Sequence, residues 1–195
     1  MNEKPDFGVY HHSSEKASNE ARDHISPMFV EAFKRTGIPE DKNIEILDAG
    51  CGLGFLCWVA ASYFPNARIT GVDTFTDGSL KNSSIEQAYS NMRILGINNR
   101  VDFLNRNLLD PLGQDKRYDL AVSSLVLHNI GKRAGTALKN IHTSLKSDGY
   151  FLNGDIQIGG SVKNYFSGIF KQEFKIMAVK GLSMKSYEIN CLRPV

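Results

Sequence analysis

The chain has 195 residues, 42% of them hydrophobic, and a formal net charge of +2. This length suits one well-buried core and is short for two, so we expect a single domain over residues 1–195. The small net charge argues against sequence-independent binding to nucleic acid, and the longest apolar run is about half of the ~20 residues that a membrane span needs. The three cysteines lack disulfide or metal-ligand spacing, which favours a reducing, cytoplasmic setting.

The beginning of the chain is expected to form a helical cover. Apolar residues such as Ile25 and Phe29 recur at helical spacing within residues 11–35, which predicts one or two helices there. The residues ahead of them include His11 and His12. These two side chains either close over a site or belong to a loose terminus.

The most informative segment is IEILDAGCGLGF, which begins with a buried-strand pattern over residues 44–49 and should enter a helix at Phe55. Gly50, Gly52 and Gly54 lie between these two elements. Glycines let the backbone bend tightly and let a ligand lie against the main chain, close to the free N–H groups of the helix start. The turn therefore predicts a site for a nucleotide-like cofactor.

A second predicted strand, over residues 68–72, ends in Asp73, at the ~20-residue spacing expected of a carboxylate that accepts from ribose hydroxyls. Dinucleotides and S-adenosylmethionine both bind to this layout. Dinucleotide sites use Gly-x-Gly-x-x-Gly, whereas here the third glycine comes one residue early and Phe55 stands in its place. The spacing favours S-adenosylmethionine and leaves a nicotinamide-dependent oxidoreductase as the alternative.

The middle of the chain continues the alternation of strands and helices. Ser83 and Glu86 stand at capping-box spacing, which predicts a helix that ends near Gly96. The longer link before it, residues 74–82, is either a surface loop or a flap over the site. Further strands are predicted over residues 101–104, 118–123 and 150–153.

The last predicted elements are two helices and a strand pair. The helix before the fifth strand carries an apolar stripe from Ala134 to Leu145 and should end at Asp148 and Gly149. Another helix is predicted near residues 162–171. The segments 174–179 and 187–192 predict an antiparallel pair joined by a turn that contains Gly181 and Ser183.

Together these elements predict an α/β fold with a Rossmann-like, doubly wound, mostly parallel sheet and helices on both faces. Residues 1–42 are assigned to the N-terminal helical cover and residues 43–155 to a cofactor-binding core. Residues 156–195 are assigned to the C-terminal helix and the antiparallel strand pair.

Five strings between residues 46 and 155 resemble, in order, the motifs of the class I S-adenosylmethionine-dependent methyltransferases. They are ILDAGCGLG, ITGVD, VDFLNRNLLDPL, YDLAVSSLVLHNI and LKSDGYFLNGD. The resemblance implies a seven-stranded sheet in the order 3-2-1-4-5-7-6 with the last strand antiparallel. It also implies an enzyme with S-adenosylmethionine as cofactor and no metal.

The resemblance implies roles for individual side chains. Asp48 would interact with the methionine ammonium and Asp73 with the ribose. Asn107 stands where the family usually has an aspartate for the adenine amine; its amide oxygen can accept the same bond, or it caps the loop. The implied cofactor set is Asp48, Gly50, Cys51, Gly52, Gly54, Asp73, Thr74, Asn107, Leu108 and Ser123.

The methyl acceptor is less defined. His128 follows the fourth strand, and its imidazole either removes a proton from the acceptor or positions it. The chain lacks an Asn/Asp-Pro-Pro-Tyr/Phe string and a Pro-Cys nucleophile after that strand, which disfavours adenine, glutamine and cytosine carbon five as targets. The short cover favours a small molecule over a protein or RNA acceptor. A non-catalytic subunit that binds the cofactor is a further hypothesis.

Overall fold

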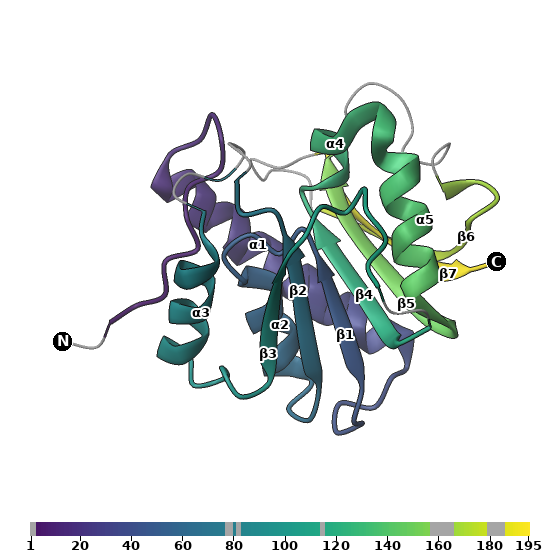
Figure 1. Ribbon diagram of the computed structural model, residues 1–195, viewed down its shortest axis with the longest axis horizontal. Coiled ribbons are helices and arrows are strands. Elements are labelled where there is room, and N and C mark those ends of the chain that lie inside the picture. The colour runs from purple at the N-terminus through teal and green to yellow at the C-terminus, as the bar shows by residue number, and fades with distance from the viewer. Residues whose placement is uncertain (1–2, 77–79, 81–82, 114–115, 157–165, 179–185) are drawn as a thin grey trace.

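The computed structural model describes residues 3–76, 80, 83–113, 116–156, 166–178 and 186–195. Its strands form one sheet in the order β3-β2-β1-β4-β5-β7-β6, which confirms the predicted order (Figure 1). β1 to β5 are parallel, and β7 pairs antiparallel with both β5 and β6. The strands are β1 Glu45–Ala49, β2 Arg68–Asp73, β3 Val101–Asn105, β4 Tyr118–Ser124, β5 Leu145–Ile156, β6 Phe170–Met177 and β7 Tyr187–Pro194.

Helices cover both faces of the sheet, with α1, α2 and α3 on one face and α5 on the other (Figure 1). The helical elements are α1 Glu15–Thr36, α2 Phe55–Tyr63, α3 Ile85–Ile94, α4 Leu127–Ile130, the 3-10 turn η1 Gly131–Arg133 and α5 Ala134–Ser144. None of these described helices is both long and apolar enough to cross a membrane.

The central strand β1 shows why its sequence is apolar at successive positions. Ile46 packs in the layer with α1 and α2, whereas Leu47 packs in the layer with α5. Both side chains are fully buried. A strand covered on both faces has no polar side to display, so it reads as a continuous apolar run.

Two helix boundaries differ from the prediction. α3 is capped by Ser84, whose side chain accepts from the backbone N–H of Gln87, so the cap lies one residue after Ser83. α5 ends at Ser144, and Leu145 opens β5 opposite Tyr118 of β4. The prediction that this helix extends to Asp148 was wrong, because an apolar residue such as Leu145 fits a helical stripe and a strand equally well and strand pairing decides its state.

The C-terminal elements also differ. Phe170 and Lys171 belong to β6, not to the helix predicted near residues 162–171. Phe170 is buried against Phe151, with ring centroids 5.5 Å apart, which anchors the beginning of this strand. Residues 162–165 of that helix, and the predicted turn with Gly181 and Ser183, lie outside the described residues.

Candidate functional site

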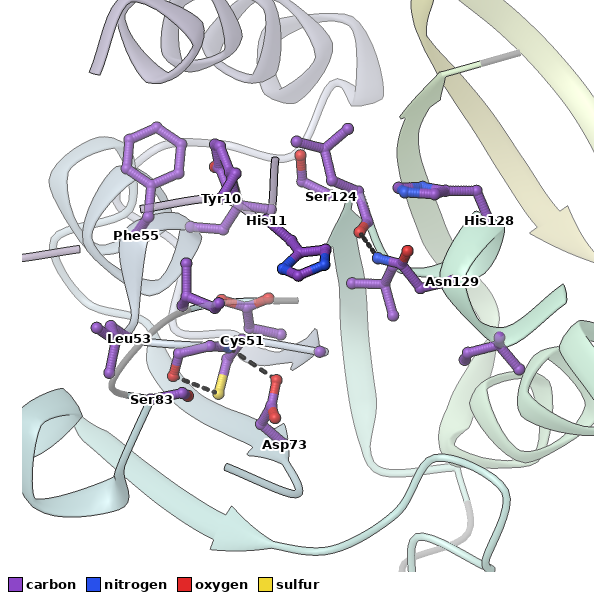
Figure 2. Close-up of a pocket in the computed structure, with 18 of the residues that line it drawn as sticks. Tyr10, His11, Cys51, Leu53, Phe55, Asp73, Ser83, Ser124, His128 and Asn129 are labelled. Atoms are coloured by element: carbon purple, nitrogen blue, oxygen red, sulfur yellow. Dashed lines mark hydrogen bonds between the residues drawn. The ribbon is translucent and has the colours of Figure 1, made fainter. Parts of the chain in front are cut away.

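A cavity of about 670 Å³ lies at the carboxyl ends of the parallel strands, where ligands bind in sheets of this type. Its walls come from the turn after β1, the ends of β2 and β4, the loop after β3, α4 and the N-terminal residues (Figure 2). Of the residues that the sequence analysis assigned to a site, those on the cavity wall are Asp48, Gly50, Cys51, Gly52, Asp73, Thr74, Asn107, Leu108 and His128. Gly54 and Ser123 are not on that wall.

The glycine turn is held by the neighbouring strand. The backbone N–H of Gly50 donates to the carbonyl of Val72 at 2.8 Å, and Gly50 has a φ of +80°. Gly54 begins α2 with a φ of +86°, and a Cβ there would lie 2.8 Å from Cε of Met92. Gly54 thus lets α3 pack closely beneath the turn, while Gly50 and Gly52 face the cavity.

Asp73 connects the turn to the loop after β2. Its Oδ2 accepts from the backbone N–H of Gly52 at 2.9 Å, and its Oδ1 accepts from that of Phe75 at 2.9 Å. These bonds fix the carboxylate at the cavity wall (Figure 2). Each oxygen retains a further lone pair with which it can accept from a ligand hydroxyl.

Asp48 is a buried carboxyl group at the cavity wall, with 1% of its surface exposed. Burial raises its pKa to about 7; the hydrogen bond from the Cys57 thiol, with Sγ 3.2 Å from Oδ2, opposes this, and the charge of Asp73 adds to it. A buried carboxylate of this kind is stabilised by a cation that arrives beside it.

Asn107 and Leu108 form the wall after β3. The side-chain oxygen of Asn107 accepts from the backbone N–H of Leu109 at 2.9 Å, so this amide caps the loop. Its oxygen still has a second lone pair for a ligand. Leu108 is buried, and its carbonyl accepts from the side chain of Asn140 at 2.9 Å, which fixes the loop.

The two serines at the end of β4 face opposite ways, as successive strand residues do. Ser123 is fully buried, and its hydroxyl donates to the carbonyl of Ala49 at 2.8 Å. The Ser123 side chain is thus bonded to β1 and does not line the cavity. Ser124 lines the cavity, and its hydroxyl lies 2.7 Å from the hydroxyl of Tyr187 on β7.

His128 is held by a residue that the sequence analysis missed. Asp155, at the end of β5, places Oδ1 2.6 Å from Nδ1 of His128, and its Oδ2 accepts from the backbone N–H of His128 at 3.1 Å. The carboxylate is almost fully buried, whereas the imidazole lies at the cavity wall (Figure 2). In a neutral ring that donates from Nδ1, the other nitrogen, Nε2, is the proton acceptor.

The N-terminal residues 6–13, which we name the N-terminal strap, pack against α2 and α3 and line the cavity. Backbone atoms of Asp6 exchange two hydrogen bonds with the side chain of Asn91 on α3, at 2.9 and 2.7 Å. Phe7 stacks on Trp58 of α2 with ring centroids 5.9 Å apart. His11 and His12 are thereby placed on the cavity wall, although the hydrophilic sequence around them carries no clear signal for this placement.

These features belong to a known class of protein. A family model described as a methyltransferase domain matches residues 40–191, which is most of the chain. The chain therefore belongs to the class I S-adenosylmethionine-dependent methyltransferases, a family of enzymes whose cofactor is S-adenosylmethionine. This membership sets aside the nicotinamide-dependent oxidoreductase.

Individual relatives are similar over part of the chain. It is 35% identical over 79 residues to a ribosomal protein uL3 glutamine methyltransferase of Bradyrhizobium diazoefficiens, covering 40% of this chain and 23% of the relative. It is 30% identical over 106 residues to a malonyl-[acyl-carrier protein] O-methyltransferase of Acetivibrio thermocellus, covering 54% of this chain and 33% of the relative. The chain thus spans less than two thirds of either relative.

A solved structure shows the same fold over most of the chain. It is a Burkholderia thailandensis 1,6-didemethyltoxoflavin-N1-methyltransferase with bound 1,6-didemethyltoxoflavin and S-adenosylhomocysteine. The TM-score is 0.68 at 19% identity, with 95% of this chain and 84% of the other covered. At this identity the likeness concerns the fold alone.

Proposed function

We propose that this protein transfers the methyl group of S-adenosylmethionine to a nucleophilic atom of a small molecule. The proposal depends on one observation, that two chemically different groups of residues line the same cavity. The carboxylates Asp48 and Asp73 and the glycine turn suit the cofactor. His128, held by Asp155, suits the acceptor.

The cofactor half of the cavity matches the chemistry of S-adenosylmethionine group by group. Asp48 would pair with the methionine ammonium, because a cation compensates for the burial of this carboxylate. Asp73 would accept from the ribose hydroxyls. Asn107 and Leu108 would bound the adenine, and Gly50 and Gly52 would let the ligand approach the main chain.

The bound cofactor supplies a methyl group that its sulfonium already activates. The chain must then hold the acceptor in line and exclude water, and alignment of this kind contributes roughly 7–11 kcal/mol in favourable cases. The N-terminal strap supports both tasks, since it is bonded to α3 and brings His11 and His12 to the cavity wall. A cleft of low polarity also favours the spreading of charge during transfer.

His128 would remove a proton from a hydroxyl or amine of the acceptor. Asp155 bonds to the backbone N–H of His128 and to Nδ1 of its ring, which leaves Nε2 as the accepting nitrogen. Of the two relatives, one is a ribosomal protein methyltransferase and the other a malonyl-[acyl-carrier protein] methyltransferase, whereas the similar solved structure holds a small molecule, 1,6-didemethyltoxoflavin. A cavity of about 670 Å³ that the N-terminal strap helps to line favours the small molecule among these.

The test is turnover with cofactor that carries a labelled methyl group. The purified protein is incubated with fractionated small-molecule extracts, and S-adenosylhomocysteine and labelled products are measured by mass spectrometry. We expect one product class, which should form more slowly with Asp73→Ala when the cofactor is limiting. Binding of cofactor without turnover in any fraction, together with a stable complex with a partner methyltransferase, would favour the non-catalytic subunit instead.

A further inference from the structure

Two hydroxyl groups from distant parts of the chain meet beside the cavity. Ser124 ends β4 and lines the cavity, whereas Tyr187 begins β7 and is 1% exposed. Their oxygens lie 2.7 Å apart. Because β5 separates β4 from β7 in the sheet, the Tyr187 side chain must pass over an entire strand to reach Ser124.

Gly154 of β5 leaves room for this crossing. It pairs with Ser124 on one side and with Ile189 of β7 on the other. A Cβ at position 154 would overlap the hydroxyl oxygen of Tyr187 and would lie 2.8 Å from Cζ of the same ring. Gly154 is not among the residues with a positive φ, so the sequence needs glycine here for space and not for backbone conformation.

The surroundings of Tyr187 fix the direction of the hydrogen bond. The ring belongs to the buried apolar layer that also contains Phe29 of α1, and within the described part of the chain its hydroxyl bonds to Ser124 alone. If Ser124 donated, the phenol proton would be buried without an acceptor, which is costly. Burial also raises the pKa of Tyr187 well above its usual value, so the phenol keeps its proton. The phenol therefore donates and Ser124 accepts.

Ser124 then keeps one proton of its own to donate. Among the described residues, no carbonyl or carboxylate accepts it, and the side chain lines the cavity. His128 lies on the same β4–α4 side of the cavity and presents Nε2 as an acceptor (Figure 2). Both are tied to successive residues of β5, because Leu125 N–H donates to the Gly154 carbonyl at 2.9 Å and His128 bonds to Asp155. This wall thus offers one donor and one acceptor.

We propose that Ser124 donates a hydrogen bond to an oxygen or ring nitrogen of the methyl acceptor, and that Tyr187 is the positioning residue that holds the Ser124 hydroxyl. This inference rests on the proposed function. The acceptor then carries two groups, a hydroxyl or amine that loses its proton to His128 and a separate hydrogen-bond acceptor such as a carbonyl oxygen. The Ser124 proton stays on its own oxygen during transfer. A fixed donor of this kind selects against analogues that lack the matching group.

The test uses the extract fraction that the wild type methylates in the labelled-methyl assay. Turnover is measured against the concentration of this fraction at saturating S-adenosylmethionine, and binding of S-adenosylhomocysteine is measured by calorimetry. We expect Ser124→Ala to raise the apparent KM for the fraction by roughly three- to tenfold, the range of one neutral hydrogen bond, with unchanged S-adenosylhomocysteine affinity. Ser124→Thr, which keeps a hydroxyl, should restore most of the wild-type KM. The labelled product should contain a hydrogen-bond acceptor besides the methylated atom.

The double variant Ser124→Ala/Tyr187→Phe is the matched control for folding. Ser124→Ala leaves the buried phenol without a partner and should lower Tm, whereas the double variant removes both hydroxyls. It should regain Tm and keep the raised KM. Tyr187→Phe alone, in which the Ser124 hydroxyl is free to turn, should have an intermediate KM.

Three results would overturn the proposal and leave methyl transfer, and with it the proposed function, intact. The first is a wild-type KM in the double variant. The second is a loss of S-adenosylhomocysteine affinity in the Ser124→Ala variant as large as the rise in KM, which would assign the hydroxyl to the cofactor. The third is a double variant no more stable than Ser124→Ala, which would remove the role of Tyr187. If the wild type methylates no fraction, both proposals fail.

Discussion

Relative to wild type, Asp48→Asn should stabilise the cofactor-free protein more at alkaline pH than at acidic pH. Burial raises the pKa of Asp48 from 3.8 to about 7 in the folded protein. Between these two values the unfolded chain binds fewer protons at this residue than the folded chain, so the free energy of unfolding falls as pH rises. From pH 5 to pH 8 this amounts to about 2–3 kcal/mol for the wild type. The uncharged amide lacks this term.

The assay is urea unfolding of both proteins at pH 5 and pH 8 without cofactor. The other titrating groups cancel in the difference between the two proteins, because they are present in both. The free energy of unfolding of Asp48→Asn minus that of wild type should therefore grow by about 2–3 kcal/mol from pH 5 to pH 8. A difference that stays constant within about 0.5 kcal/mol would refute the reasoning that Asp48 is a destabilised carboxyl group.

Further variants test three separate parts of the site. Asp73→Ala should weaken binding of S-adenosylhomocysteine by roughly tenfold to hundredfold in calorimetry while circular dichroism reports an intact fold; equal affinity would remove the ribose role. Asp155→Asn and His128→Ala should each lower kcat by about 10²–10⁴ with unchanged cofactor affinity; wild-type turnover would make His128 a bystander. Gly50→Ala, whose Cβ would overlap Val126 at a φ of +80°, should cost about 2–5 kcal/mol in thermal unfolding. Adding Val126→Ala should recover part of that loss, and full recovery would show that the backbone is unstrained.

The sheet was predictable because each strand end carries its own local signal. Apolar runs gave β1 and β2, and the glycine turn and Asp73 followed them at the expected spacing. The boundaries were less predictable where one residue satisfies two patterns. Leu145 continues the helical stripe of α5, yet it begins β5, because pairing with β4 is a tertiary contact that the local sequence does not encode.

Most residues that the sequence analysis expected to contact the cofactor do line the cavity, whereas other residues of the wall were missed. Asp48 and Asp73 lie within or next to the motif strings, whereas Asp155 meets His128 across 27 positions of the chain. Arg22 reaches the cavity from a helix that reads as a plain cover. Such contacts depend on how α1, α4 and β5 are arranged in space, so residue type and spacing alone do not reveal them.

The residues that the sequence analysis expected and those that it missed differ in what holds them in place, and this difference bears on acceptor specificity. The wall proposed for the cofactor includes main chain that is tied to the sheet, as in the bond from Gly50 N–H to the Val72 carbonyl and that from Gly52 N–H to Asp73. A change there disturbs strand order and turn together. The wall proposed for the acceptor includes side chains on α4 and on the N-terminal strap, such as His128 and His11. Loop and terminal side chains change without loss of the fold, so the acceptor can differ between relatives that share this sheet.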